Sequence, residues 1–462
     1  MEVGDTWGMK VFREWDPRQE WLLPPSPQEW LPGDHLVYCV LDVVEQLDLR
    51  GIEGYYQQRD ARGEKAYHPR MMVALLLYGY ATGVVSSRRL ERATWEDVPT
   101  RVLAGGQHPD HTRIAEFRRR HLKELAGLFV QVLRICQKAG VVALGHVALD
   151  GTKVRANASK HKAMSYGRMV KSEQELMAEV AALLERAERV DAEEDARYGV
   201  GVRGDELPEA LRRREERLAR LRQAKAELEA EAAAVRAAEE QGKGSEPPAG
   251  SAAGGDGLPR HRVRPTKEGR PPAKAQRNFT DPDSRIMKHQ GAYLQGYNGQ
   301  LVVDAAHQVI VAQALTNQAA DGEHLEPMLE LVEAGTGARP KRLSADAGYW
   351  SERNVAVCTK RGIDAFIAPG RLKHGEVPPA ARGRPPKDLG AKGRMWRKLR
   401  TKQGRAVHAK RKGIVEPVIG QIKGRGFWRL LLRGLDKARG EWALITTGHN
   451  LLKYYRFAWR AT

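Results

Sequence analysis

The sequence has little cysteine and no long apolar run. Its three cysteines, Cys39, Cys136 and Cys358, are too few and too scattered for a disulfide framework or a zinc cluster. They fit a reducing compartment. No apolar run approaches the roughly 18 residues that a membrane-spanning helix needs, and the first ten residues lack the apolar stretch of a signal peptide. We therefore expect a cytoplasmic protein without a membrane segment.

Several motifs of nucleotide and metal chemistry are also missing. The sequence contains no GxxxxGK[ST] phosphate loop, which argues against an ATP-driven motor, and we expect no ATP requirement. No HExxH zinc motif occurs. His-x-Glu triplets start at His324 and His374, but neither is followed by Cys-x-x-Cys, so a zinc deaminase is excluded.

Positive charge is the dominant feature of the composition. The 462 residues include 77 Lys and Arg against 58 Asp and Glu, a net charge of +19. Such an excess repels itself in a compact state, so a polyanionic partner is the simplest explanation. The length corresponds to about three domains, and 41% hydrophobic residues can build a sizeable core.

The first 140 residues predict an extended arm followed by a helical domain. Residues 1–30 are rich in Trp and Pro, whereas apolar residues recur at helical spacing in 36–49 and 69–83, and further helices are expected over 86–97 and 111–140. We interpret 31–140 as a helical DNA-binding domain, with a packing or dimerisation domain as the alternative. The arginines proposed to contact DNA are Arg88, Arg89, Arg113, Arg118, Arg119 and Arg120.

The middle of the chain interrupts a strand pattern. VALD (147–150) predicts a buried strand, after which GTKV (151–154) is expected to turn the chain. Residues 160–240 are dominated by Ala, Glu, Arg, Lys and Leu, which predicts a helical hairpin or short coiled coil with a break at 197–208. Residues 241–275 are rich in Gly, Pro, Ser and Ala, which is typical of a flexible linker. The leucines of the expected seam are Leu211, Leu218, Leu221 and Leu228.

The strand pattern resumes after this insertion. Residues 291–317 predict two strands joined by a turn at 304–307, followed by alternating helices and strands up to DAFIAP (364–369). With 141–159 as its leading strand, the segment 276–462 predicts an α/β domain with a mixed sheet flanked by helices. Residues 381–413 hold 13 Lys or Arg and one acid, a pattern suited to binding a phosphate backbone. Long helices are expected near 404–424, with a kink at Pro417, and near 436–458.

Three acids stand out by position. Asp150 ends the strand VALD, Asp346 ends RLSAD, and Glu416 lies on the helix after the basic stretch. Carboxylates from adjacent strand ends and a packed helix can converge on divalent metal, and two ions about 4 Å apart can drive an in-line phosphoryl transfer. Each acid also has a simpler interpretation, as a turn cap, a strand-end acid or a solvent-facing helix residue. Competing acids are Asp304, Asp321 and Glu326.

Three segments together carry a family resemblance. LDGTKVRANAS, ADAGYWSE and KGIVEPVIGQIK, in this order, resemble the catalytic segments of DDE transposases of bacterial insertion sequences, and most closely the insertion sequence 1182 family. HPRMMVALLLYGYATGVVSSRRLER and HTRIAEFRRRH resemble the helical N-terminal domain of such enzymes. The resemblance covers about residues 10–160 and 275–460.

The resemblance implies a ribonuclease H-like catalytic domain that acts on double-stranded DNA in the bacterial nucleoid. Asp150, Asp346 and Glu416 then hold Mg²⁺ or Mn²⁺, with two ions expected, and a homodimer on the terminal inverted repeats is expected. Lys412 stands where many relatives have Arg, and Ala409 where they have Tyr. Further expected contacts to DNA are Arg411, Lys412 and Lys423, for which solvated cations are the alternative.

Three other functions are compatible with parts of the sequence. A nuclease of the same fold would cut DNA without joining ends. A catalytically silent, transposase-derived protein would bind DNA alone. A structural protein built around residues 170–240 would leave the C-terminal half unexplained. Tyr349 and Trp350, just after Asp346, either stack on a splayed base or pack against the sheet, and packing is favoured.

Overall fold

A computed structural model gives the fold. It describes residues 29–57, 65–198, 209–241, 257–289, 291–370, 380–381, 383–384, 386 and 389–461. Nearly all of the predicted N-terminal arm and part of the basic stretch lie outside these ranges. None of the helices in the described part of the chain combines the length and apolar character needed to cross a bilayer.

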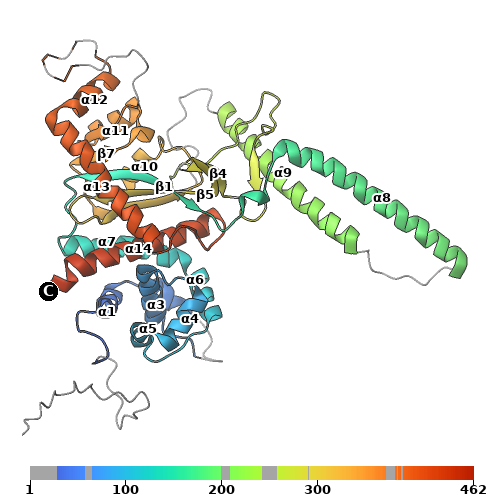
Figure 1. Ribbon diagram of the computed structural model, residues 1–462, viewed down its shortest axis with the longest axis horizontal. Coiled ribbons are helices and arrows are strands. Elements are labelled where there is room, and N and C mark those ends of the chain that lie inside the picture. The colour runs from blue at the N-terminus through green and yellow to red at the C-terminus, as the bar shows by residue number, and fades with distance from the viewer. Residues whose placement is uncertain are drawn as a thin grey trace, which may run out of the picture.

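The N-terminal part is helical, as predicted, and lies below the sheet in Figure 1. Pro69 occupies the first turn of its helix, where its missing N–H costs nothing, and Gly83 ends the helix at φ +85°. Ser86 holds the N-cap position but makes no side-chain cap hydrogen bond. The helices are α1 (Leu36–Gln46), α2 (Arg50–Gln57), α3 (Pro69–Thr82), α4 (Ser87–Glu96), α5 (Val98–Leu103), α6 (His111–Arg120) and α7 (Leu122–Lys138).

The helix predicted over 111–140 is in fact two helices. The backbone at His121 leaves helical geometry, with φ −101° and ψ 23°, and separates α6 from α7. The buried His121 ring packs against the rings of Phe117 and Tyr55. This tertiary contact gives a physical reason for the break, which the apolar spacing does not reveal.

A six-stranded mixed sheet forms the centre of the C-terminal part. Its order is β4-β5-β1-β7-β8, with β6 also paired to β5. β1 is antiparallel to β5 and parallel to β7, which is parallel to β8. The predicted α/β order is therefore confirmed. The strands are β1 (Val147–Arg155), β4 (Arg285–His289), β5 (Ala292–Asp304), β6 (Ile310–Thr316), β7 (Arg342–Ala345) and β8 (Asp364–Ile367).

One strand prediction is wrong. The chain does not turn after Asp150; β1 continues to Arg155, and Gly151 pairs with Gln300 of β5. The 13-residue β5 supplies a partner along the whole of β1, so the ladder hydrogen bonds hold Gly151 in extended backbone. Asp150 consequently lies within a strand instead of at its end.

Helices cover the sheet and join it to the N-terminal part (Figure 1). α13 crosses β1, β5, β7 and β8, while α14 packs against β6, α3 and α7. Asn450 of α14 bonds both backbone groups of Ile310, which satisfies this stretch of β6. The remaining helices are α10 (Leu325–Thr336), α11 (Glu352–Lys360), α12 (Ala391–Arg400), α13 (Lys402–Gly424) and α14 (Leu435–Phe457).

α13 runs through Pro417 without ending there. A proline inside a helix leaves the carbonyl four residues earlier without its usual N–H partner. That carbonyl belongs to Gly413, and the side-chain amide of Gln308 donates to it at 3.1 Å. The β5–β6 turn thus supplies the missing donor and helps to fix α13 on the sheet.

The predicted insertion is a two-helix hairpin that projects from the sheet (Figure 1). Its helices are α8 (Tyr166–Tyr198) and α9 (Glu209–Gln241), and the short strands β2 (Ala163–Ser165) and β3 (Gln276–Asn278) pair at its base. Three leucines of the predicted seam, Leu218, Leu221 and Leu228, are buried. The side chain of Leu211 lies outside the described residues.

The linker prediction does not fit residues 257–275. Leu258 and Val263 are buried, and the backbone N–H of His261 donates to Asn317 at 2.9 Å. Proline and glycine in this stretch therefore shape a packed segment, although the same composition is typical of flexible chain. Residues 242–256 lie outside the described ranges.

Candidate active site

Asp150 lies on β1 with a mostly buried carboxylate. One oxygen accepts the N–H of Gly151 at 2.8 Å. Burial raises the pKa of Asp150 to about 6; the guanidinium of Arg411 opposes this shift and the negative charge of Asp346 adds to it. Ionised Asp150 therefore loses solvation free energy in its buried position, and a nearby cation would stabilise its charge.

Asp346 follows β7 directly and stands beside Asp150. Leu149 of β1 pairs with Ala345 of β7, and the residue that follows each of them is an aspartate. Asp346 accepts the N–H of Gly348 at 2.9 Å and caps the short 3₁₀ turn Ala347–Tyr349. The register thus sets Asp150 and Asp346 next to each other, although Asp150 lies within β1 and not at a strand end as predicted.

Arg411 of α13 neutralises Asp150. Its Nη1 donates to an Asp150 oxygen at 2.7 Å, and the two side chains are 11% and 18% exposed. Its Nε is buried and has no hydrogen-bond partner. A DNA contact by Arg411 stays a prediction, because this guanidinium is engaged inside the protein.

Glu416, the third predicted acid, does not join this pair. It is exposed on α13, five residues after Arg411, which corresponds to about 140° around a helix. Among the described residues, no group of three or more His, Cys, Asp and Glu side chains is arranged to hold a metal ion. The structure thus brings two of the three predicted acids together.

Asp321, which the sequence offered as a competing acid, lies in a polar network next to them. One of its oxygens accepts from Asn298 at 2.7 Å and from Gln300 at 2.8 Å, and Lys153 lies 3.4 Å away. Desolvation lowers the pKa of Lys153, while the nearby charges of Asp321, Asp346 and Asp150 oppose this. The sequence analysis missed Lys153, Asn298 and Gln300, although polar residues inside the strand of QGYNGQLVVD were a usable signal.

Two glycines allow these groups to approach one another. A Cβ at Gly151 would lie 2.7 Å from Gln300 Nε2 and 2.8 Å from Asp321 Oδ1. At Gly348 it would lie 3.1 Å from Asp346 Oδ1 and 3.5 Å from Asp321 Oδ2. The glycines of LDGTKV and ADAGYW are therefore explained by space beside the acids.

Tyr349 packs beneath the site, as favoured from the sequence. It is fully buried, and its hydroxyl donates to the side-chain oxygen of Gln300. Trp350 is partly buried against the same core. Stacking of Tyr349 on a base is therefore wrong for this structure.

The predicted cations after Asp346 have different surroundings. Lys412 is exposed on α13. The ammonium of Lys423 lies 5.5 Å from the centre of the Trp428 ring, and partial burial lowers the pKa of Lys423. Trp428 itself is 60% exposed, so a cation and an aromatic face share this surface.

The six N-terminal arginines also differ. Arg118 is buried and donates to the carbonyl of Val85 at 2.8 Å, so the predicted DNA contact does not fit it. Arg120 is half-buried, pairs with Glu116 and lies over the Tyr55 ring. The exposed members of the set are Arg88, Arg89, Arg113 and Arg119.

A divalent cation fits the chemistry of the Asp150–Asp346 pair. Carboxylate oxygens are the ligands that such ions prefer. Burial raises the Asp150 pKa and the negative charge of Asp346 adds to the shift, so the ionised pair calls for positive charge, part of which Arg411 supplies. Two of the predicted ligands thus meet the requirement, and Glu416 does not lie with them.

Comparisons with known proteins give two family matches. Residues 261–451 match a model described as Transposase DDE domain, and residues 25–120 match Transposase domain (DUF772). No curated protein and no solved structure gives a match. Together the two domains indicate a transposase of the DDE type and support the predicted insertion-sequence transposase, and the mixed sheet flanked by helices is consistent with a ribonuclease H-like core.

Proposed function

We propose that this chain is the transposase of an insertion sequence, related to the insertion sequence 1182 family, and that it binds the terminal inverted repeats of its element. Water hydrolyses a strand at the element end. The freed 3′-hydroxyl then attacks a phosphodiester of target DNA, which joins the two strands as the 3′-oxygen of the target leaves. The observation that carries the proposal is the pair of adjacent strand positions occupied by Asp150 and Asp346. Both belong to the part of the chain that resembles DDE catalytic segments, and Asp346 lies within the matched DDE domain.

The proposed active site is a carboxylate pair on a ribonuclease H-like sheet. Asp150 and Asp346 would hold Mg²⁺ or Mn²⁺, which supplies charge stabilisation for the attacking and leaving oxygens of phosphoryl transfer. Glu416 is the proposed third ligand, which requires its part of α13 to move when metal or DNA binds. The ammonium of Lys153 donates a hydrogen bond to Asp321 and so holds that carboxylate beside the Asp150–Asp346 pair.

Arg411 has a specific part in this proposal. It compensates the charge of Asp150 in the structure, and a DNA phosphate near the acids offers its guanidinium a second acceptor. Exposed Arg88, Arg89 and Arg119 supply contacts to the inverted repeat from the N-terminal domain. The remaining proposed backbone contacts are Arg113, Lys412 and Lys423.

A joining assay tests the proposal. The purified chain is incubated with a labelled, pre-cleaved element end, a supercoiled plasmid and Mg²⁺, beside Asp150→Asn and Asp346→Asn. Joined product that is lost in both variants, while end binding is retained, supports the proposal. Cleavage without joining would indicate the nuclease, and binding without either reaction would indicate the silent DNA-binding protein.

A further inference from the structure

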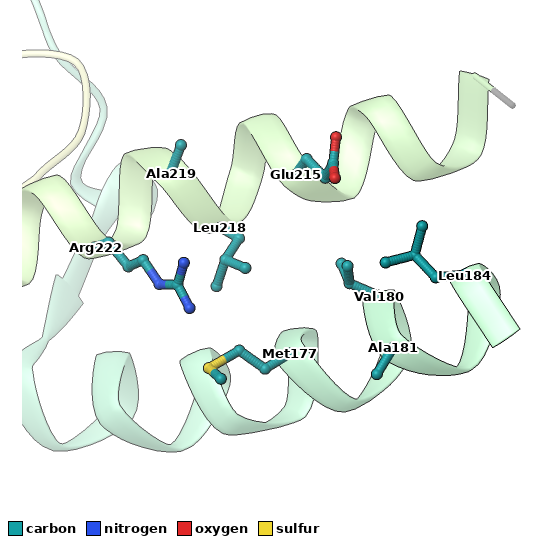
Figure 2. Close-up of a pocket in the computed structure, with 8 residues that line it drawn as sticks. All are labelled: Met177, Val180, Ala181, Leu184, Glu215, Leu218, Ala219 and Arg222. Atoms are coloured by element: carbon teal, nitrogen blue, oxygen red, sulfur yellow. The ribbon is translucent and has the colours of Figure 1, made fainter. Parts of the chain in front are cut away.

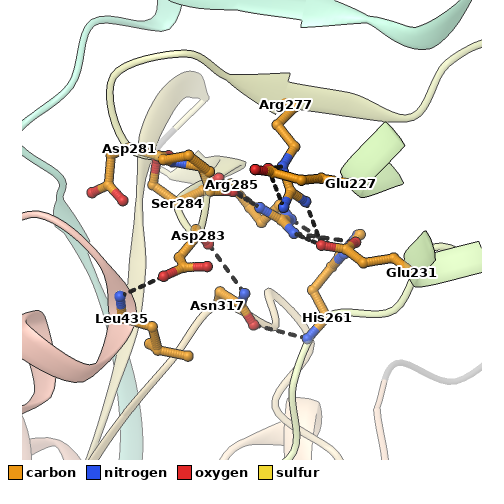
Figure 3. A network of polar contacts seen from close by, with 11 residues as sticks. Glu227, Glu231, His261, Arg277, Asp281, Asp283, Ser284, Arg285, Asn317 and Leu435 are labelled. Carbon is orange, nitrogen blue, oxygen red and sulfur yellow. Dashed lines mark hydrogen bonds and ion pairs between the residues drawn. The ribbon is translucent and has the colours of Figure 1, made fainter. Parts of the chain in front are cut away.

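The hairpin formed by α8 and α9 is fixed to the catalytic part by buried charge (Figure 3). Arg277 and Arg285, each 8% exposed, extend from the base of the hairpin and from β4. Arg277 pairs with Glu227 and Glu231 of α9, and Arg285 also reaches Glu231 at 3.3 Å. Two neighbouring guanidinium groups therefore depend on α9 for their counter-charge, which fixes where the hairpin starts.

The inner half of the hairpin has a core of its own. Met169 of α8 and Leu228 and Ala232 of α9 are fully buried, and Val263 of the 257–275 segment packs with them. This half is covered on its own and needs no further partner.

The outer half carries more apolar surface than α9 alone covers. Apolar residues of α8 fall at 176, 180 and 183 and also at 177, 181 and 184, which makes a stripe wider than one helix contact. Leu176 is buried, but Met177 is 47% exposed and Leu184 is 40% exposed.

These residues border an open groove between the two helices (Figure 2). Its volume is about 390 Å³, and Leu218, Val180 and Leu184 point into the space between the helices. Most of the lining side chains are apolar, and Glu215 and Arg222 are the charged ones. The lining residues are Met177, Val180, Ala181, Leu184, Glu215, Leu218, Ala219 and Arg222.

Charge on the outer half is divided between the two helices. Among the described side chains, residues 173–185 of α8 carry four acids and no base, whereas residues 212–225 of α9 carry seven bases and two acids. Within the chain this division already produces ion pairs, such as Arg214 with Glu179 at 2.9 Å. The same surface presented twice is complementary to itself when the α8 of one copy faces the α9 of the other.

We propose that the occupant of this groove is the hairpin of a second copy of this chain. A two-fold arrangement would close two grooves at once and make a four-helix bundle with Met177 and Leu184 inside. The opposite charges of α8 and α9 select this pairing and disfavour α8 against α8. The inference concerns self-association and does not depend on the proposed transposase reaction.

Light scattering coupled to size exclusion tests it on the full chain without DNA. We expect a dimer, whose dissociation constant rises roughly 100-fold in Met177→Glu and Leu184→Glu because each buries an unpaired charge. Ala182→Glu is the matched control, because Ala182 is exposed on α8, does not border the groove and gains the same charge. Circular dichroism verifies that the hairpin stays helical.

Cross-linking gives a second readout. The three native cysteines are buried, so Ala181→Cys introduces an accessible thiol in the groove, and Ala182→Cys one outside it. A short bismaleimide should join two copies through Cys at 181 at least tenfold faster than through Cys at 182. A monomeric wild type, or a dimer that both glutamate variants leave intact, overturns the proposal. If those variants stay monomeric like the wild type and instead lose DNA affinity, the hairpin is a DNA contact.

Discussion

The guanidinium of Arg411 and the carboxylate of Asp150 form a 2.7 Å ion pair that ties α13 to the central strand β1. The two residues are 261 positions apart in the sequence, and both side chains are largely shielded from solvent. The pair brings the basic C-terminal segment directly to the proposed catalytic acids. Removing the Arg411 side of this ion pair therefore tests both its contribution to folding stability and its effect on the charge of Asp150.

Arg411→Met should lower the unfolding free energy by roughly 3 kcal/mol, because it leaves a buried carboxylate without its counter-charge. Urea denaturation at pH 8 measures this loss. Lys412→Met is the control, since Lys412 is exposed on the same helix and its loss should cost below about 0.5 kcal/mol. Equal midpoints for Arg411→Met and the wild type would show that the ion pair does not contribute to stability.

The loss of unfolding free energy in Arg411→Met should depend on pH. The pKa of Asp150 is raised to about 6 in the fold, above its ordinary value of 3.8, so folding favours the protonated acid. A group of this kind penalises the folded state above its folded pKa, and the penalty disappears as pH falls. The deficit of Arg411→Met relative to the wild type should therefore shrink between pH 8 and pH 5. A deficit that grows as pH falls would contradict this assignment.

Much of the fold followed from local patterns, and the exceptions have tertiary causes. The strands of 291–317 and the helices 325–336 and 352–360 were predictable, because each has its own apolar period and turn. The sequence predicts an end of β1 at Gly151, since a glycine resembles a turn when its partner, Gln300, is 149 positions later in the chain and its pairing is unknown. The sequence likewise predicts one helical stretch over 111–140, because the ring contacts of His121 that separate α6 from α7 are tertiary and do not show in the apolar spacing.

The candidate site was predictable in part. Strand-end position singled out both Asp150 and Asp346, and family resemblance supported both. Asp150, however, lies within β1, and the pairing register that sets the two side by side is a property of the sheet. Arg411 was noticed as one cation in a basic run, and no sequence pattern distinguishes it from exposed Lys412. Lys153 and Asn298 were missed because polar residues inside a strand do not show what lies across from them.

Glu416→Gln tests the third proposed ligand. We expect joining of DNA ends to fall by at least about 100-fold, with binding of the inverted repeat unchanged, because the proposal has Glu416 join the acids in the assembled complex. Asp321→Asn is the comparison; it keeps the side-chain volume and should cost about 10-fold to 100-fold through displaced neighbours. Full activity of Glu416→Gln beside an inactive Asp321→Asn would transfer the third role to Asp321.

Gly151→Ala should disturb the acids without changing any of them. The added methyl would lie 2.7 Å from Gln300 Nε2 and 2.8 Å from Asp321 Oδ1, so those side chains must move, at a cost of about 1–3 kcal/mol. We expect a lower thermal midpoint together with reduced joining. Gly127→Ala within α7 is the control, because its added methyl meets nothing within 4 Å and should stabilise the helix by about 0.5–1 kcal/mol. An unchanged midpoint for Gly151→Ala would mean that the site is roomier than the structure indicates.

Glu231→Ala should loosen the hairpin at its base. Glu231 is the acid that Arg277 and Arg285 share, so its loss leaves two nearly buried guanidinium groups with Glu227 as the remaining acid of α9 in this network. Breaking a buried pair of this kind costs on the order of 3 kcal/mol, and the cost falls on the contact that orients α9. Hydrogen exchange of the amides over 224–236 should therefore speed up, while α14 amides keep their protection. Glu240→Ala removes an exposed pair with Arg236 on the same helix and should change exchange little. If Glu231→Ala and Glu240→Ala exchange alike, the hairpin is held by its apolar core around Leu228 and the charged network has no part in orienting it.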